Sequence, residues 1–216
     1  AANQVERGCP FDCGLCPAHG QHTCTALIEI TGRCNLGCPV CFADAGGGAD
    51  REPSLARIGF LLDRVLAASG PCNLQLSGGE PTVREDLPGI IALARRQGFR
   101  RRQLNTNGLR LAAAPDYAVQ LKEAGLASVF LQFDGLSAAS HQALRGRDLR
   151  AIKEAAIRYA AAAGLGIVLV PTLVPGVNTA EVGAIIDYAA RFAPAVRGVH
   201  FQPVSSFARF QQAPAG

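Results

Sequence analysis

Short apolar runs alternate with longer helix-like stretches along most of the chain. The strand-like runs lie at residues 26–31, 73–77, 103–105, 128–133, 167–174 and 198–203. The helical stretches lie at residues 54–69, 84–97, 114–124, 137–163 (with a break near Gly146) and 179–192. Helix-end signals support these limits, with polar residues before two stretches and a glycine after four, namely Ser54, Asn178, Thr179, Gly70, Gly98, Gly125 and Gly164. Strands separated by helices imply right-handed crossovers, so the pattern predicts an α/β fold with a parallel sheet.

Size and composition fit one soluble domain. With 216 residues, 49% of them hydrophobic, the chain can bury a core without cross-links. Its net charge of +4 is too mild to argue for a nucleic-acid partner. No apolar run approaches transmembrane length and the first residues do not resemble a signal peptide, so we expect a reduced, cytoplasmic setting. The chain contains no methionine, which indicates that Ala1 is not the translated start.

Three cysteines follow the first predicted strand closely. Cys34, Cys38 and Cys41 have the spacing C-x-x-x-C-x-x-C. Three thiolates this close can hold three corners of a [4Fe-4S] cluster, which normally takes four cysteine ligands. The fourth iron would then be open to a small molecule, so the triplet indicates chemistry as well as electron storage.

A glycine-rich segment follows the second predicted strand. Gly78 and Gly79 permit close approach of the backbone to a ligand, and the carboxylate of Glu80 can receive an ammonium group. Further polar positions follow the third strand and end the fourth, at Asn105, Asn107, Gln132 and Asp134. Three of these residues also have a plain structural role open to them: the two asparagines can close a turn with Gly108, and Asp134 can cap the next helix. We expect the side chain of Gln132 to point into the barrel.

Together these motifs resemble the radical S-adenosylmethionine (SAM) superfamily. Residues 78–82, 105–108 and 132–135 are similar to its G-G-E-P, T-T-N-G and S-L-D-G segments, in the same order, and the resemblance covers roughly residues 24–207. One departure is Val40, where many members carry an aromatic residue; Phe42 follows the last cysteine instead.

The resemblance implies a partial (β/α)6 TIM-like barrel for residues 25–216, with its active face at the C-terminal ends of the strands. It also implies that the free iron chelates SAM and that an electron from the cluster cleaves SAM to methionine and a 5′-deoxyadenosyl radical. By this resemblance the residues expected to bind the cofactor are Phe42, Gly78, Gly79, Glu80, Asn105, Asn107, Gln132 and Asp134.

Four more cysteines precede the triplet, in a small segment at residues 1–24. Cys9, Cys13, Cys16 and Cys24 lie among glycines and prolines and predict a second, closed metal site. Mononuclear zinc, rubredoxin-like iron and an auxiliary iron–sulfur cluster all suit four thiolates. The plain alternative, four unliganded thiols, would leave the segment prone to oxidation.

The N-terminal string and residues 198–204 are similar to one branch, which contains tetraether lipid synthases and pterin-methylating radical SAM proteins. That resemblance implies hydrogen abstraction from an unactivated carbon, followed by C–C bond formation or methylation. A lipid needs a wide apolar groove, whereas a pterin needs a small pocket with convergent hydrogen-bonding groups. Because Asn105, Gln132 and Gln202 can supply such groups, we expect a compact small-molecule substrate, with a lipid as the alternative.

Two residues are candidates for direct catalytic roles. Glu29 interrupts an apolar strand, so it is either a satisfied core carboxylate or a group facing the active cavity. Gln202 lies near the end of the last predicted strand. We expect Gln202 and His200 to face opposite sides, so that only one of them meets the cavity.

Partners are less strongly indicated. The arginines of residues 95–96 and 100–102 form either a solvated rim or a docking patch for an acidic electron donor such as flavodoxin or ferredoxin. The alternative to an enzyme is a non-catalytic iron–sulfur or zinc protein that carries electrons. The intact G-G-E-P run argues against that alternative, since a scaffold has no need to contact the amine of SAM.

Overall fold

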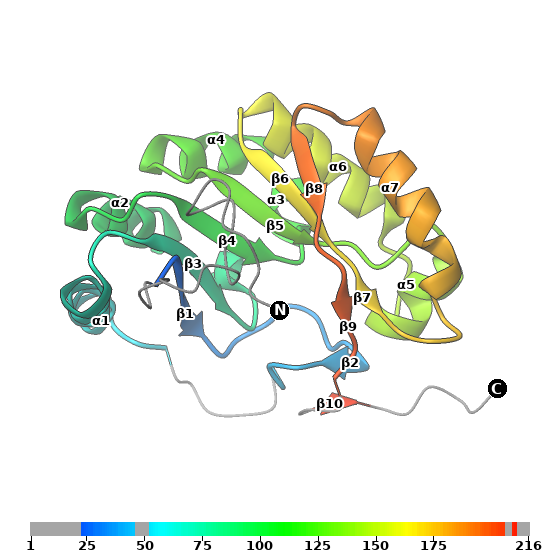
Figure 1. Cartoon of the computed structure of the whole chain (residues 1–216), viewed down its shortest axis with the longest axis horizontal. Helices are drawn as coiled ribbons and strands as arrows, with labels where there is room; N and C mark the ends of the chain where they lie inside the picture. The colour runs from blue at the N-terminus through cyan, green and yellow to red at the C-terminus, as the bar shows by residue number, and fades with distance from the viewer. Residues whose placement is uncertain (1–22, 46–51, 206–208, 211–216) are drawn as a thin grey trace, which may run out of the picture.

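The computed structural model describes residues 23–45, 52–205 and 209–210. Its main sheet has six strands in the order β1-β3-β4-β5-β6-β8, and every neighbouring pair is parallel. The strands are β1 (Thr25–Thr31), β3 (Asn73–Gly78), β4 (Arg102–Thr106), β5 (Ser128–Gln132), β6 (Gly166–Val170) and β8 (Val196–Val199). Figure 1 shows the curved sheet with its helices along one side. Because β1 and β8 are edges that do not pair, the sheet is a partial barrel, which confirms the predicted fold class.

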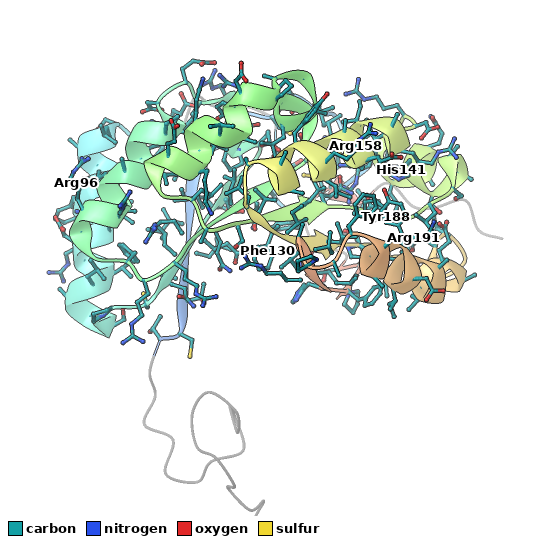
Figure 2. The ribbon with its side chains drawn as sticks, turned by 90° about the horizontal axis from the view of Figure 1, so that it is seen from above. Arg96, Phe130, His141, Arg158, Tyr188 and Arg191 are labelled. Atoms are coloured by element: carbon teal, nitrogen blue, oxygen red, sulfur yellow. The ribbon has the colours of Figure 1, made fainter. Side chains whose placement is uncertain are left out.

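The helices lie in the crossovers between strands. They are α1 (Leu55–Ser69), α2 (Leu87–Gln97), α3 (Leu109–Ala113), α4 (Pro115–Ala124), α5 (Ala138–Arg145), α6 (Arg150–Ala162) and α7 (Val182–Arg191), with short 3-10 turns η1 (Pro81–Val83) and η2 (Thr179–Glu181). The break predicted near Gly146 in the stretch at 137–163 is confirmed, because Gly146 takes a left-handed conformation (φ 76°) that ends α5. Helix α3 was not expected. Helix α7 carries Tyr188 (Figure 2). The ring of Tyr188 stacks on that of Phe133, with centroids 5.2 Å apart.

The last two predicted strands are each interrupted. Residues 167–174 form β6 and then β7 (Thr172–Leu173), because Pro171 has no N–H to continue the ladder. β7 pairs in parallel with β9 (Gln202–Pro203) in a small separate sheet beyond β8. A second small sheet joins β2 (Val40–Cys41) to β10 (Arg209–Phe210), which brings the end of the described chain back to the cysteine triplet (Figure 1).

The two faces of the main sheet differ in character. Side chains that face the helices form the core and are at most 9% exposed: Ile28, Ile30, Leu74, Leu76, Leu104, Val129, Leu131, Ile167 and Leu169. The alternate positions face the concave side, where the apolar Phe130 and Val170 are joined by four polar side chains: Gln75, Ser77, Asn105 and Gln132. Parallel strands are usually apolar on both faces, so this polar inner row marks a cavity.

The basic cluster lies at the opposite end of the sheet from the cysteine triplet. Arg96 lies in the last turn of α2 (Figure 2), and Arg102 begins β4 and donates to the carbonyl oxygens of Phe99 and Gly125. The cysteines instead follow the C-terminal end of β1. A strand of five residues spans about 17 Å, so a donor docked on these arginines would face the far end of the barrel. The solvated-rim interpretation therefore fits better.

In the described part of the chain, no helix is both long and apolar enough to cross a membrane.

Candidate active site

The cysteine triplet lines one wall of a cavity of about 670 Å³ at the C-terminal edge of the sheet. Cys34 and Cys41 are half-buried and Cys38 is buried. The backbone N–H of Leu36 donates to Cys34 Sγ at 3.4 Å, so the loop begins to wrap the sulfur as it leaves β1. Three thiols that are separated along the chain therefore open into one space, as the spacing predicts.

The donor set fits three corners of an iron–sulfur cluster. Burial raises the pKa of the Cys34 thiol in the metal-free chain, and the N–H of Leu36 opposes that rise. Iron binding reverses the preference, because the thiolate is the ligand. No three His, Cys, Asp or Glu side chains of the described residues converge on a single ion. A cubane cluster does not need them to, since each cysteine binds a different iron.

Gly78 and Gly79 are required by the approach of the chain's own backbone. Gly78 has φ +132°, and a Cβ there would lie 2.2 Å from the Thr31 carbonyl oxygen. A Cβ on Gly79 would lie 2.3 Å from the Arg33 carbonyl oxygen. The N–H of Gly79 donates to Thr31 O at 2.9 Å, so these glycines seat the start of the cysteine loop on the end of β3.

Glu80 is 1% exposed, and protein donors surround its carboxylate. Oε1 accepts from Thr82 N and Oγ1 (3.1 and 2.7 Å) and from Thr106 Oγ1 (2.8 Å). Oε2 accepts from Asn107 N at 2.6 Å. Glu80 also lines the cavity, so the residue expected to meet an ammonium group joins the β3 loop to the end of β4 as well.

The two asparagines after β4 hold different parts of the site. Asn105 donates to Ser77 Oγ (3.1 Å) and accepts from Gln75 Nε2 (2.6 Å), which forms a row of amides on the inner face. Asn107 Nδ2 donates to Asn35 Oδ1 at 2.7 Å, between two of the cysteines, while its Oδ1 accepts from Leu109 N at 3.0 Å. Both asparagines line the cavity, and Asn107 also closes the turn that the sequence offered as its alternative role.

Asp134 is not among the cavity-lining residues. Its fully buried carboxylate forms a two-pronged ion pair with Arg145, with N–O distances of 2.6 and 2.8 Å, and accepts from Thr172 N at 3.1 Å. It does not cap α5, because Ser137 does so through Ser140 N. Arg145 also donates to Val40 O at 3.0 Å, so this pair anchors the cysteine loop.

Gln132 and Phe42 both line the cavity. Phe42 is 67% exposed at its rim, while Gln132 lies deeper, where the ammonium of Lys153 donates to its Oε1 at 2.9 Å. Lys153 itself is fully buried on α6.

The structure differs from the sequence-based expectations for His200, Gln202 and Glu29. His200 and Gln202 both line the cavity, so the expectation that only one would do so is wrong. Residues two apart on a strand share a face, and here the strand also breaks after Val199. Glu29 is exposed on β1 and is absent from the cavity-lining residues, so it is not a core carboxylate.

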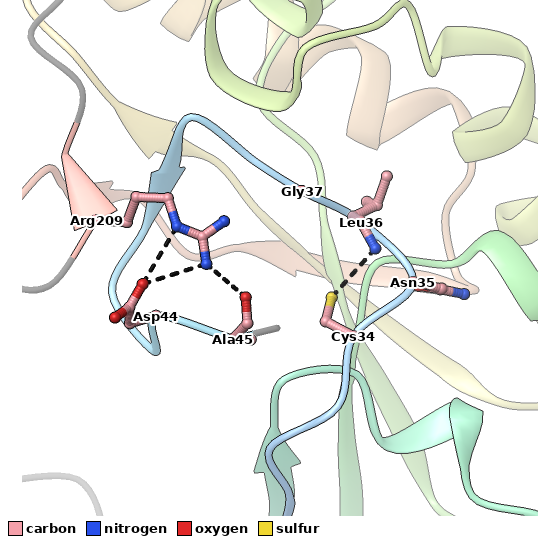
Figure 3. Close-up of a pocket in the computed structure, with 7 residues that line it drawn as sticks. All are labelled: Cys34, Asn35, Leu36, Gly37, Asp44, Ala45 and Arg209. Carbon is pink, nitrogen blue, oxygen red and sulfur yellow. Dashed lines mark hydrogen bonds and ion pairs between the residues drawn. The ribbon is translucent and has the colours of Figure 1, made fainter. Parts of the chain in front are cut away.

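A smaller pocket of about 470 Å³ lies against the outside of the cysteine loop (Figure 3). Its lining includes Cys34 and residues 35–37. Arg209 closes one side through an ion pair with Asp44 (3.2 Å) and hydrogen bonds to the carbonyls of Cys38 and Ala45. The β10 segment thus holds the loop from the side opposite the cavity.

The predicted N-terminal metal site falls mostly outside the described residues. Of its four cysteines only Cys24 is described, exposed just before β1; Cys9, Cys13 and Cys16 are not. The second metal centre and the segment boundary at residue 24 stay predictions. Asn178, expected as a helix cap, instead donates from its buried amide to Asp134 O and Thr172 O.

Sequence reasoning missed three residues of the site. Gln75 alternates with Leu74 and Leu76, and a polar residue between buried neighbours could have marked the inner row. Arg145 and Lys153 gave no such signal, because a single cation in a charged helix normally indicates a solvated position.

Comparison with known proteins agrees with this geometry. The model of the radical SAM superfamily matches residues 28–189. A 7,8-dihydro-6-hydroxymethylpterin dimethyltransferase of Methanocaldococcus jannaschii is 48% identical over 97% of the chain, which covers 42% of that protein. A probable GTP 3′,8-cyclase of Methanothermobacter thermautotrophicus is 33% identical over 79% of the chain and 55% of the relative. The chain thus spans about half the length of these curated relatives.

Solved structures share the fold at low sequence identity. The crystal structure of Streptococcus suis SuiB bound to S-adenosylmethionine matches with a TM-score of 0.71 at 15% identity, over 89% of this chain and 44% of that one. The structure of anSMEcpe with bound AdoMet matches with a TM-score of 0.68 at 21% identity, over 84% and 51%. The family match spans most of the barrel, from within β1 to within α7, and the cysteine triplet and residues 78–82 lie inside it. This chain belongs to the radical SAM superfamily.

Proposed function

We propose that this chain is the catalytic core of a radical SAM enzyme that methylates a carbon of a pterin. The observation that carries the proposal is the 48% identity, over 97% of the chain, to a protein named as a dimethyltransferase of 7,8-dihydro-6-hydroxymethylpterin. Because the chain covers 42% of that relative, the pterin and the methyl transfer are proposals and do not follow from the family alone.

In this proposal the cysteine triplet holds the cluster and SAM lies beside residues 78–80. The bound cluster supplies the electron that splits SAM into methionine and a 5′-deoxyadenosyl radical. Glu80 supports an ammonium group at this place, because among the described residues Oε2 accepts one hydrogen bond, from Asn107, and keeps acceptor capacity. The link from Asn107 to Asn35 keeps that carboxylate and the cysteine loop in one fixed arrangement.

The inner row of the sheet supports a compact heterocyclic substrate. Phe130 and Phe201 offer ring faces, while Gln75, Asn105 and Gln202 offer amide groups to the same cavity. A flat ring with alternating donors and acceptors uses both kinds of group. Gln75 and Asn105 already bond to each other, and a lipid chain would leave their remaining hydrogen-bonding capacity unused, so the lipid alternative is disfavoured.

The rim of the cavity is apolar and open. Phe42 is 67% exposed and Leu27 is 54% exposed, although both line the cavity. A carbon radical must be kept from solvent, so in the working enzyme this rim is covered by bound substrate, by the N-terminal segment or by a partner. For the electron donor, flavodoxin or ferredoxin, the side of the cysteine loop is the better approach, since the arginines near Gly98 lie at the other end of the barrel.

The test follows hydrogen from the substrate carbon. The chain, reconstituted without oxygen, is incubated with SAM, dithionite and 7,8-dihydro-6-hydroxymethylpterin carrying deuterium on its carbon atoms. With a second SAM as the methyl donor, released as S-adenosylhomocysteine, and dithionite as the source of both electrons, we expect deuterium in 5′-deoxyadenosine and a pterin heavier by one or two methyl groups. A parallel incubation uses vesicles of a phospholipid with deuterated acyl chains. Transfer from the lipid, or SAM cleavage with no transfer from the pterin, would contradict the proposal.

A further inference from the structure

Lys153 is a fully buried cation with no assigned role. It lies on α6, on the helical side of the sheet, and its ammonium reaches between the ends of β4 and β5. There Nζ donates to the backbone oxygen of Asn107 at 2.6 Å and to Oε1 of Gln132 at 2.9 Å. Burying a lysine is costly, so the contacts at its tip are the natural place to look for its purpose.

The hydrogen bond from Lys153 fixes the orientation of the Gln132 side-chain amide. An ammonium group only donates, so the oxygen of the amide must face Lys153 and the NH2 must face away. Gln132 lines the cavity, and its Nε2 is buried without a partner among the described residues. A buried donor with no acceptor is unfavourable and is relieved when a ligand supplies one.

We propose that Lys153 is a positioning residue that locks the Gln132 amide with its NH2 available to an oxygen acceptor, carboxylate or carbonyl, on the ligand that fills the cavity. The same ammonium also donates to the backbone oxygen of Asn107, whose N–H donates to Glu80. Lys153 therefore fixes both the Gln132 amide and the backbone beside Glu80. This inference rests on the proposed use of the cavity by SAM and a pterin.

The lock depends on the charge of Lys153. Burial lowers its pKa to about 7, which the negative charge of Asp134 opposes and the positive charge of Arg145 reinforces. The other titratable groups that influence it electrostatically are Glu80, Cys38 and His141. Below pH 7 the ammonium holds Oε1; above it the neutral amine can accept as well as donate, so either orientation of the amide is satisfied. Ligand affinity should therefore fall as the pH rises through about 7.

The experiment compares three reconstituted proteins: wild type, Lys153→Met and Gln132→Glu. The glutamate keeps an acceptor for Lys153 but removes the NH2, so it separates holding the lysine from donating to a ligand. Affinity for SAM, and for 7,8-dihydro-6-hydroxymethylpterin in the presence of S-adenosylhomocysteine, is measured by equilibrium dialysis from pH 6 to 8.5. Unfolding midpoints are measured alongside.

We expect Gln132→Glu to lose about tenfold in affinity for one of the two ligands, at every pH, with no drop in its unfolding midpoint. Lys153→Met should bind that ligand more weakly than wild type at pH 6. At pH 8.5 the two affinities should be similar, because the wild type has then lost the charge on Lys153. The amine of SAM itself titrates in this range, so the readout is the difference between proteins. Wild-type affinity of Gln132→Glu for both ligands, or an unaltered pH profile in Lys153→Met, would overturn the inference. Because binding is measured without turnover, this result is independent of whether the pterin is methylated. If Lys153→Met does not fold, the pH profile of the wild type measured against that of Gln132→Glu decides.

Discussion

Glu80 and Asn107 carry much of the contact between the cysteine loop and the sheet. The carboxylate of Glu80 accepts two hydrogen bonds from Thr82 in its own loop and two from Thr106 and Asn107 at the end of β4. The side chain of Asn107 reaches Asn35, between the cysteines. The sequence motifs predicted that both residues contact a ligand, but a motif does not show which residues of the protein lie around them. Gly78 and Gly79 show the difference most clearly, because the structure explains them by the close approach of the backbone of residues 31–33.

That attribution predicts a large difference between two glycine-to-alanine substitutions. Gly79→Ala would place a Cβ 2.3 Å from the Arg33 carbonyl oxygen, next to Cys34, so we expect a loss of about 1–3 kcal/mol in unfolding free energy and reduced iron content. Gly89→Ala is the control: it lies in α2 with no atom within 4 Å of the new Cβ, and should gain up to about 1 kcal/mol. Chemical denaturation and iron analysis provide the check. Equal stability of the two variants would refute the packing account.

At the scale of elements, the strand–helix alternation was enough to predict the parallel sheet and the edge where the motifs gather. It also predicted the break near Gly146, which ends α5. It did not predict that Pro171 ends β6, although that proline was visible in the sequence and has no N–H to continue the ladder. The ion pair of Asp134 with Arg145 was not predictable, because it depends on a helix folding back over the end of β5.

This ion pair should matter far more than a surface pair of the same kind. Asp134→Asn leaves the guanidinium of Arg145 buried without its counter-charge, so we expect a loss of about 3–5 kcal/mol in unfolding free energy. The control is Glu154→Gln, whose exposed pair with Arg158 spans 3.7 Å along α6 and contributes about 0.5 kcal/mol or less. Denaturant titration of both variants measures the difference. Similar small losses would show that the pair does not anchor the cysteine loop.

In the molecule as a whole, the cysteine triplet and the polar cavity residues gather at the C-terminal edge of the barrel, and an apolar rim lies beside them. The N-terminal cysteines precede β1 and the triplet follows it, so the seven residues of β1 separate the two groups in sequence. The cysteine spacings predicted two metal sites, and the structure places the cysteines of one of them, the triplet, in the wall of the cavity. The identity of the second centre is beyond spacing arguments, because four thiolates accept zinc, iron or a cluster equally well.

We favour an auxiliary iron–sulfur cluster at Cys9, Cys13, Cys16 and Cys24. The reconstituted chain should then contain about eight irons and eight sulfides, and a variant with alanine at those four positions about four of each. A mononuclear site would instead add one metal and no sulfide to the first cluster. Iron, zinc and sulfide analysis of both proteins distinguishes these results. Unchanged metal content in the four-alanine variant would show that the segment binds none.

The central claim is that Cys34, Cys38 and Cys41 hold the cluster that cleaves SAM. The most direct measurement is the 5′-deoxyadenosine formed from SAM and dithionite by the reconstituted wild type and by the variant with alanine at all three positions. We expect steady formation by the wild type and none by the variant, which should keep the metal of the N-terminal cysteines. Formation of 5′-deoxyadenosine by the triple variant would show that these three cysteines do not hold the cluster that cleaves SAM.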